Sequence, residues 1–158
     1  MKKSRPSETD IFARRPVAAL RASLNQLDIA AEADVAGLEP FMEATIAAAM
    51  IIAHADGEAD LTERRRIISL FRASRLLQGF SADDIAREIV SHTQAFQLDF
   101  HSALLHARSQ IVTADLTNEQ FRALVDVCVS VLEADGVRHA AEEEALANIS
   151  SMRPWGYR

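Results

Sequence analysis

Apolar side chains recur along most of this chain at spacings of three and four residues, the period of an amphipathic α-helix. One stretch, from Leu38 to the Asp56-Gly57 pair, is apolar on nearly every side and is typical of the central helix of a bundle. Six further helices with a single apolar face are expected to begin near residues 17, 62, 81, 100, 117 and 140. No segment alternates apolar and polar residues for long enough to predict a strand. The pattern therefore predicts an all-α, single-domain helical bundle of about seven helices.

Residues suited to helix caps stand at several of the expected boundaries. Thr62 is expected to cap the third helix and Ser81 the fourth, because a side-chain oxygen there can accept the first free backbone N–H groups. Thr117 and Gln120 have the spacing of a capping box at the start of the sixth helix. Gly79 is expected to end the third helix.

The chain of 158 residues has a net charge of −6 and is long enough to bury a core without metal or disulfide staples. Residues 1–16 contain five basic and two acidic side chains, so the rest of the chain is more acidic than the net value indicates. We expect residues 1–16 to be a flexible basic N-terminal arm and residues 17–158 to form the helical domain. An acidic domain argues against a broad nucleic-acid-binding surface.

Cysteine and hydropathy patterns bear on where the protein works. Cys128 is the only cysteine, which excludes an internal disulfide and suits a reducing compartment. The most apolar run, from Ala44 to Ala53, is half the length of a membrane span and predicts a buried helix. No continuous apolar segment follows the basic residues as it would in a signal peptide. We therefore expect a cytoplasmic protein that is not integral to a membrane.

The clearest sequence feature is an internal repeat. When Asp56 is aligned with Asp135, at an offset of 79 residues, both copies read apolar helix, Ala-Asp-Gly, five further residues, Glu and a second apolar helix. The glutamates of the two copies are Glu63 and Glu142. The matched residues occupy equivalent places, namely a helix end, a turn and the first turn of the next helix. The repeat therefore predicts two similar helix–turn–helix units whose Asp-Gly turns lie close together on one side of the bundle.

Asp56 and Asp135 stand at expected helix C-termini, where the helix dipole disfavours a negative charge by about 0.3–1 kcal/mol. Two explanations remain open. Each Asp side chain can accept amide hydrogens from its own turn or the next helix, or the acidic residues can hold a cation. An EF-hand is excluded, because Ile52 and Val131 occupy the position of that loop's first Asp ligand.

On these two Ala-Asp-Gly motifs, their following glutamates and the order of the helices around them, the chain resembles the tellurite-resistance TerB family. The resemblance covers roughly residues 38–152, and the family includes a domain of a DnaJ-like membrane co-chaperone. It implies an all-helical fold around a central bundle and a role in responses to tellurium oxyanions, phage and other chemical stresses, often near membranes. The family's acidic motif residues have been proposed to chelate a metal. Carried over to this chain, that proposal implies the ligands Asp56, Glu63, Asp135 and Glu142. The chain departs from the family in the three positive charges of Arg64 to Arg66 beside the first glutamate.

These observations favour a non-enzymatic stress-response module whose acidic site binds a divalent cation or a partner protein. All-oxygen ligation favours calcium or magnesium, with manganese as a further candidate. His54 and His139 flank the Asp-Gly motifs and would shift the preference towards zinc or manganese if both turned inward. No catalytic residue and no organic cofactor are expected, since the chain has neither a phosphate-binding glycine loop nor a serine nucleophile motif. A protein partner, membrane-associated as in the family, is expected. The alternative is a purely structural helical protein-interaction domain without a metal.

Overall fold

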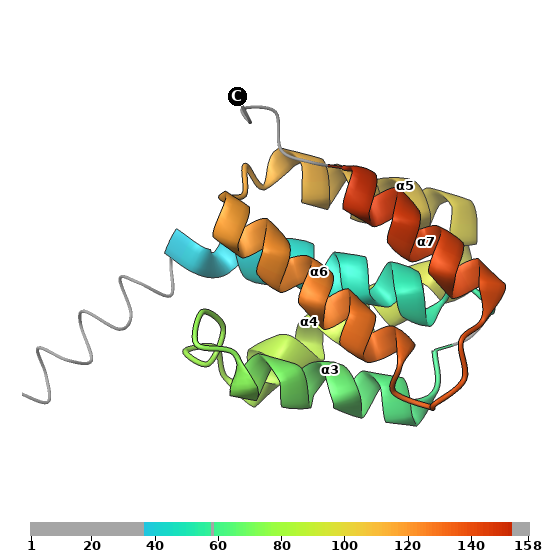
Figure 1. The fold of residues 1–158 in the computed structure, drawn as a ribbon, viewed down its shortest axis with the longest axis horizontal. Coiled ribbons are helices and arrows are strands. Elements are labelled where there is room, and N and C mark those ends of the chain that lie inside the picture. The colour runs from blue at the N-terminus through green and yellow to red at the C-terminus, as the bar shows by residue number, and fades with distance from the viewer. Residues whose placement is uncertain (1–36, 58, 153–158) are drawn as a thin grey trace, which may run out of the picture. The chain divides into compact units, whose positions relative to one another are not determined.

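The computed structural model describes residues 37–57 and 59–152, which fold into helices joined by turns, with no strand among them (Figure 1). A helix over residues 37–53 is followed by α3 (Leu61–Ala73), α4 (Ala82–Leu98), α5 (Phe100–Thr113), α6 (Asn118–Leu132) and α7 (Ala140–Ser151). The all-α prediction is confirmed for this part of the chain. The helix expected from residue 17 and the basic arm over residues 1–16 lie outside the described residues, so the total of about seven helices stays a prediction.

The helix over residues 37–53 forms the core of the bundle. From Phe41 to Ala53 every side chain except that of Glu43 is buried. Figure 1 shows this helix running through the middle of the bundle, with α3 below it and α5 and α7 above it. A helix that is apolar on all sides is stable only when other elements cover it on all sides. The prediction of a central helix is therefore confirmed.

The other helices pack around this core, and contacts between them join the first sequence repeat to the second. α4 and α5 form a hairpin connected by the single residue Asp99. The Asp99 carboxylate caps α5 by accepting the backbone N–H of Ser102 at 3.1 Å and the Ser102 hydroxyl at 2.9 Å. α6 packs against both α3 and α7. Because α3 belongs to the first sequence repeat and α6 to the second, the two repeats share one core.

Helix caps confirm the predictions at Ser81 and Thr117 and correct the one at Thr62. The Ser81 hydroxyl accepts the backbone N–H of Asp84 at 3.1 Å. Thr117 forms the expected capping box at the start of α6. α3, in contrast, is capped by Asp60 and begins one residue before Thr62. The reason is the spacing of Asp60 to Glu63, which allows these two residues to close a capping box.

The third helix is also shorter than expected, because it ends at Ala73 and not near Gly79. Ser74 leaves the helical conformation, and residues 75–79 form a turn. This turn directs Leu77 and Phe80 into the core, where they are 0% and 8% exposed. Burial of these two side chains therefore replaces the last turn of the expected helix.

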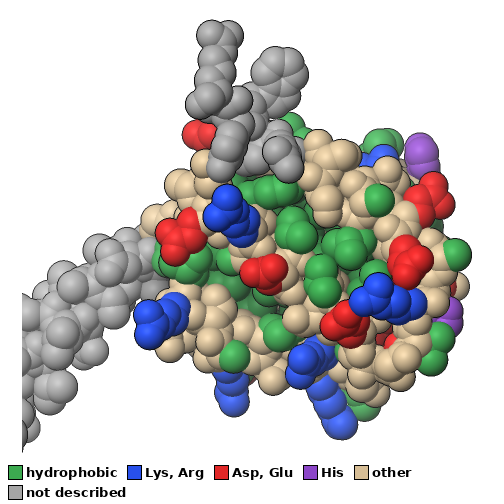
Figure 2. Space-filling view, in the orientation of Figure 1, with side chains coloured by type: hydrophobic (Ala, Val, Ile, Leu, Met, Phe, Trp, Pro, Cys, Tyr) green, Lys and Arg blue, Asp and Glu red, His purple; other side chains and the backbone are tan. Residues whose placement is uncertain are grey.

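The surface of this bundle gives no sign of a membrane-crossing element. Among the described residues no helix is both long and apolar enough to cross a bilayer. Figure 2 shows basic and acidic side chains interspersed on the face turned to the viewer, around a group of apolar side chains. That face therefore lacks the continuous basic surface that binds nucleic acid.

Candidate metal centre

The two Ala-Asp-Gly segments form turns of the same construction. In the first, the N–H of Gly57 bonds to the carbonyl of His54 at 3.1 Å; in the second, the N–H of Gly136 bonds to the carbonyl of Glu133 at 3.2 Å. The two hydrogen bonds join equivalent positions, because His54 and Glu133, like Gly57 and Gly136, are 79 residues apart. Both glycines have positive φ values, 141° and 75°, which side chains rarely adopt. Equivalent backbone hydrogen bonds therefore close both turns.

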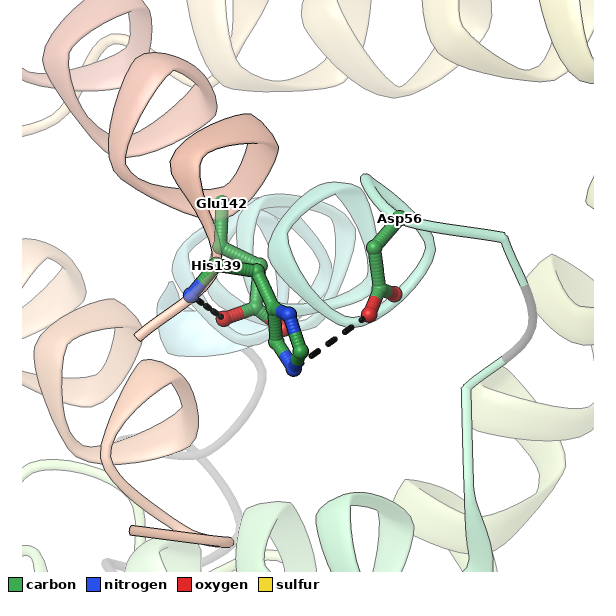
Figure 3. Close-up of side chains that lie close together, drawn as sticks. All are labelled: Asp56, His139 and Glu142. Carbon is green, nitrogen blue, oxygen red and sulfur yellow. Dashed lines mark hydrogen bonds and ion pairs between the residues drawn. The ribbon is translucent and has the colours of Figure 1, made fainter. Parts of the chain in front are cut away.

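Both turns meet at the side chain of His139. Its Nε2 lies 3.7 Å from Oδ2 of Asp56 and 3.6 Å from Oδ2 of Asp135. All three side chains are partly exposed to solvent, and Figure 3 shows the imidazole and the Asp56 carboxylate directed toward each other. The prediction that the two Asp-Gly turns lie close together is therefore confirmed.

The glutamate that follows each turn is buried at the start of a helix. Glu63 is 7% exposed and Glu142 is 2% exposed. The Glu63 carboxylate accepts the backbone N–H of Asp60 at 2.8 Å, and the Glu142 carboxylate accepts the backbone N–H of His139 at 3.4 Å. One hydrogen bond to a backbone amide offsets only part of the cost of burying a carboxylate.

The buried glutamates interact electrostatically with each other and with the aspartates of the turns. Burial raises the pKa of Glu63 to about 7, and the charges of Asp60, Glu142 and Asp56 add to that rise, whereas the hydrogen bond from Asp60 opposes it. Burial likewise raises the pKa of Glu142, with further contributions from Asp56 and Asp135. The four acidic residues named from the repeat therefore form one electrostatically coupled group. Mutual repulsion of this kind is relieved by a proton or by a bound cation.

Three residues of this region offer ligand atoms at the spacing of a metal site. One ligand atom from each of Asp56, His139 and Glu142 lies within 4.8 Å of the other two (Figure 3). Metal–ligand distances are about 2.0–2.4 Å, so ligands on opposite sides of an ion lie about 4–5 Å apart. The donor set of one imidazole and two carboxylates thus fits a divalent cation, and we call these three residues the Asp-His-Glu cluster.

The remaining two predicted ligands lie beside the Asp-His-Glu cluster. Asp135 contacts the cluster through His139, while its Oδ1 accepts the backbone N–H of Val137 at 2.9 Å. Glu63 is held in the capping box of α3. Arg64, one of three arginines that follow it, donates to the carbonyls of Ala59 and Asp60. The structure therefore brings together two of the four predicted residues, with a histidine as the third member.

Sequence reasoning missed Asp60 and the central place of His139. The offset of 79 residues aligns Asp60 with His139. Each is the residue directly before a helix, and each stands three positions before the glutamate of its own repeat. Extending the repeat alignment by this one position would have revealed them as equivalent. His54, in contrast, stacks on Phe96 of α4 with ring centroids 4.6 Å apart and lies outside the cluster.

Cys128 takes no part in the site. It is fully buried on α6, and burial raises the pKa of its thiol to about 12. A thiol in that state is protonated at neutral pH and unreactive as a nucleophile. Cys128 is therefore part of the hydrophobic core.

The family comparison covers the part of the chain in which the site lies. The family model described as tellurite resistance protein TerB matches residues 42–152, a range that includes both Asp-Gly turns and the Asp-His-Glu cluster. No match was found among curated proteins or among solved structures.

Proposed function

This chain belongs to the tellurite-resistance TerB family, and from that membership and the geometry above we propose that it is a non-enzymatic stress-response module that binds a divalent cation at the Asp-His-Glu cluster. The observation that carries the proposal is the convergence of three ligand atoms within 4.8 Å, from residues 56, 139 and 142. The four acidic residues expected from the sequence enter it with different roles. Asp56 and Glu142 are ligands, whereas Asp135 and Glu63 add negative charge around them.

The composition of the cluster refines the choice of cation. Carboxylates alone favour calcium or magnesium, but an imidazole ligand suits manganese and zinc better. His139 lies between both aspartates, so its Nε2 would be the imidazole ligand of a bound cation. We therefore extend the proposed cations from calcium, magnesium and manganese to zinc.

A cation at this place would join the two repeats. Asp56 lies in the turn after the helix over residues 37–53, whereas His139 is the N-cap of α7 and Glu142 lies in its first turn. Binding would fix the position of α7 relative to the core helix and offset the charges of Asp56 and Asp135, which add to the effect of burial in raising the pKa of Glu142. We propose that this ordering serves a protein partner, membrane-associated as in the family, and that the module works in the cytoplasm without an organic cofactor.

A second candidate function, a purely structural interaction domain without metal, has its own support. Asp135 accepts the N–H of Val137 from its own turn, and both glutamates accept the N–H of a helix N-cap residue. On this interpretation the acidic residues shape two turns and do nothing further. The two functions differ in whether a cation stabilises the fold.

Thermal unfolding of the full chain with and without each of the four cations tests the proposal. A ligand that binds the folded but not the unfolded state raises the free energy of unfolding by about 1.4 kcal/mol when its concentration is ten times its Kd. The Tm should therefore rise with manganese or zinc. His139→Gln should abolish this rise. His101→Gln, at an exposed position on α5, is the matched control and should retain it. A Tm that no cation changes would support the structural alternative.

A further inference from the structure

Large apolar side chains are exposed along α5. Of the seven such side chains exposed in the described part of the chain, three belong to this one helix: Phe100, Leu105 and Val112, which are 45%, 53% and 62% exposed. Single exposed apolar residues are common, but several on one helix form a surface that gains free energy when another apolar surface covers it. The outer side of α5 is therefore a candidate docking surface.

The spacing of these residues gives the surface its shape. Phe100, Leu104 and Arg108 follow one another at intervals of four and form one row, which lines a groove between α5 and α7. Leu105 and Val112 are seven residues apart and form a neighbouring row that is directed away from the core. The two rows together make a band that runs from the groove to the outside of the helix.

The groove is a place for side chains and not for a small-molecule ligand. Its floor contains Ile51 and Ala55 of the core region, and the methyl groups of Ala141 and Ala145 line its α7 wall. Its volume is about 170 Å³, below the range of about 300–1,000 Å³ that is usual for ligand pockets. α5 and α7 are not among the helix pairs in contact in the described part of the chain, so the space between them stays open.

The dimensions of the band match those of a helix. Leu105 and Val112 are about 10 Å apart along α5, and the row from Phe100 to Arg108 is about 12 Å long. An amphipathic helix presents apolar side chains at i, i+3 or i+4 and i+7, which covers the same distance in about two to three turns. Such a helix can place one side chain in the groove and rest others on the outer row.

Charge on the two walls specifies the polar side chains of the occupant. α5 contains no acidic residue, and the Nε of its Arg108 is buried without a hydrogen-bond partner among the described residues. A carboxylate beside this guanidinium would supply the acceptors that its surroundings lack. The α7 wall contains Glu144 and no basic residue, so it attracts a positive charge. Two copies of α5 would instead bring two Arg108 side chains together without a carboxylate.

We propose that the groove between α5 and α7, together with Leu105 and Val112, docks an amphipathic helix of a partner protein. The helix carries a carboxylate on the flank that meets Arg108 and a basic side chain on the flank that meets Glu144. The residues of the Asp-His-Glu cluster are not part of the groove lining. Docking therefore needs no bound cation and stands apart from the proposed metal site.

A synthetic peptide of the length of α5, 14 residues, is the probe. It carries a stripe of leucines with glutamates on one flank and lysines on the other, and a fluorescent label for anisotropy. Titration with the full chain in the presence of EDTA keeps the result independent of cations. Saturable binding is expected. A second peptide with lysine in place of every glutamate should bind about tenfold more weakly, because it offers no carboxylate to the guanidinium.

Variants of the full chain locate the binding surface. Leu105→Gln should weaken binding of the first peptide about tenfold, and Val112→Gln is a second variant of the same row. Arg108→Gln should remove the difference in affinity between the two peptides. Val90→Gln and Arg87→Gln change an exposed apolar and an exposed basic residue of α4, and these matched controls should bind like the wild type. Circular dichroism verifies that each variant is folded.

Three results would overturn the proposal. The first is the absence of saturable binding of the first peptide to the wild type. The second is binding that the α5 variants weaken no more than the α4 controls do, since the peptide would then lie elsewhere. The third is a dimer mass in light scattering that Leu105→Gln reduces to that of a monomer, which would make a second copy of the chain the occupant.

Discussion

His92 is a buried histidine on α4, outside the Asp-His-Glu cluster, and its environment disfavours the charged form. Burial lowers its pKa to about 4, and the charges of His106 on α5 and His54 act in the same direction. Glu88, on the same helix, lies 3.5 Å from its Nε2 and is the one acidic group in contact with it among the described residues. The folded state therefore binds a proton at His92 less readily than the unfolded chain does.

We predict that acid destabilises the protein through His92. The unfolded histidine takes up a proton below about pH 6.5, whereas the folded one resists it down to about pH 4, so stability falls as pH falls through this window. His92 alone accounts for a loss of about 2 kcal/mol at pH 5 relative to pH 7.5. The raised pKa of Glu63 acts in the opposite direction over the same window, so the contribution of His92 is the difference between wild type and His92→Leu. Urea denaturation at the two pH values measures it. His92→Leu should remove this part of the pH dependence, and His101→Leu, an exposed control, should not. Equal losses in wild type and His92→Leu would contradict the prediction.

At the scale of helices, the spacing between residues determines where α3 begins, whereas residue type alone does not. Asp60 and Thr62 both carry side chains that can cap a helix, but only Asp60 stands three residues before Glu63. The Asp60 carboxylate accepts the backbone N–H of Glu63 at 2.8 Å, and the Glu63 carboxylate accepts the backbone N–H of Asp60. The reciprocal pair fixes the helix start and also holds Glu63 in its buried position.

Removing this cap should destabilise the protein selectively. Asp60→Ala should lower the free energy of unfolding by about 1 kcal/mol, the usual value of an N-cap. Thr62→Ala, within the first turn of α3 and exposed, should change it by less than about 0.5 kcal/mol. Urea denaturation of the two variants gives the comparison. A larger loss for Thr62→Ala than for Asp60→Ala would show that the helix begins later than the structure places it.

The helix over residues 37–53 should tolerate charge least of all the elements. Ala48 is 0% exposed and lies in the middle of this helix, so Ala48→Asp would bury a carboxylate without a partner. The cost of several kcal/mol is a large share of the stability of a small domain. Circular dichroism should show loss of the cooperative unfolding transition. Ala147→Asp on α7, an exposed control, should melt within a few degrees of wild type, and melting of Ala48→Asp near wild type would contradict the central position of this helix.

At the scale of the whole molecule, the sequence predicted the elements more completely than the site. Periodic apolar residues are a local signal, so the six described helices could be located from the sequence. The end of α3 could not, because Leu77 and Phe80 leave the helix in order to reach a core built by other elements. Of the four acidic residues that the repeat indicated, Asp56 and Glu142 belong to the Asp-His-Glu cluster, whereas Glu63 and Asp135 lie beside it.

The role of His139 could not be predicted in the same way. It depends on where two turns separated by 79 residues meet, and no local pattern contains that information. The repeat predicted that the turns lie close together but not which side chain would lie between them. The cluster therefore follows from the packing of the two repeats on one core, with α6 in contact with both α3 and α7.

The central claim is that this packing creates a cation site from Asp56, His139 and Glu142. Isothermal titration calorimetry of the full chain with manganese, zinc, calcium and magnesium at pH 7.5 tests it most directly. The account predicts saturable binding of manganese or zinc, which Asp56→Asn weakens by about tenfold or more. Glu143→Gln removes the same charge from the neighbouring position on α7, outside the cluster, and should leave binding unchanged. Flat titrations of the wild type with all four cations, or equal binding by the Asp56→Asn variant, would contradict the account.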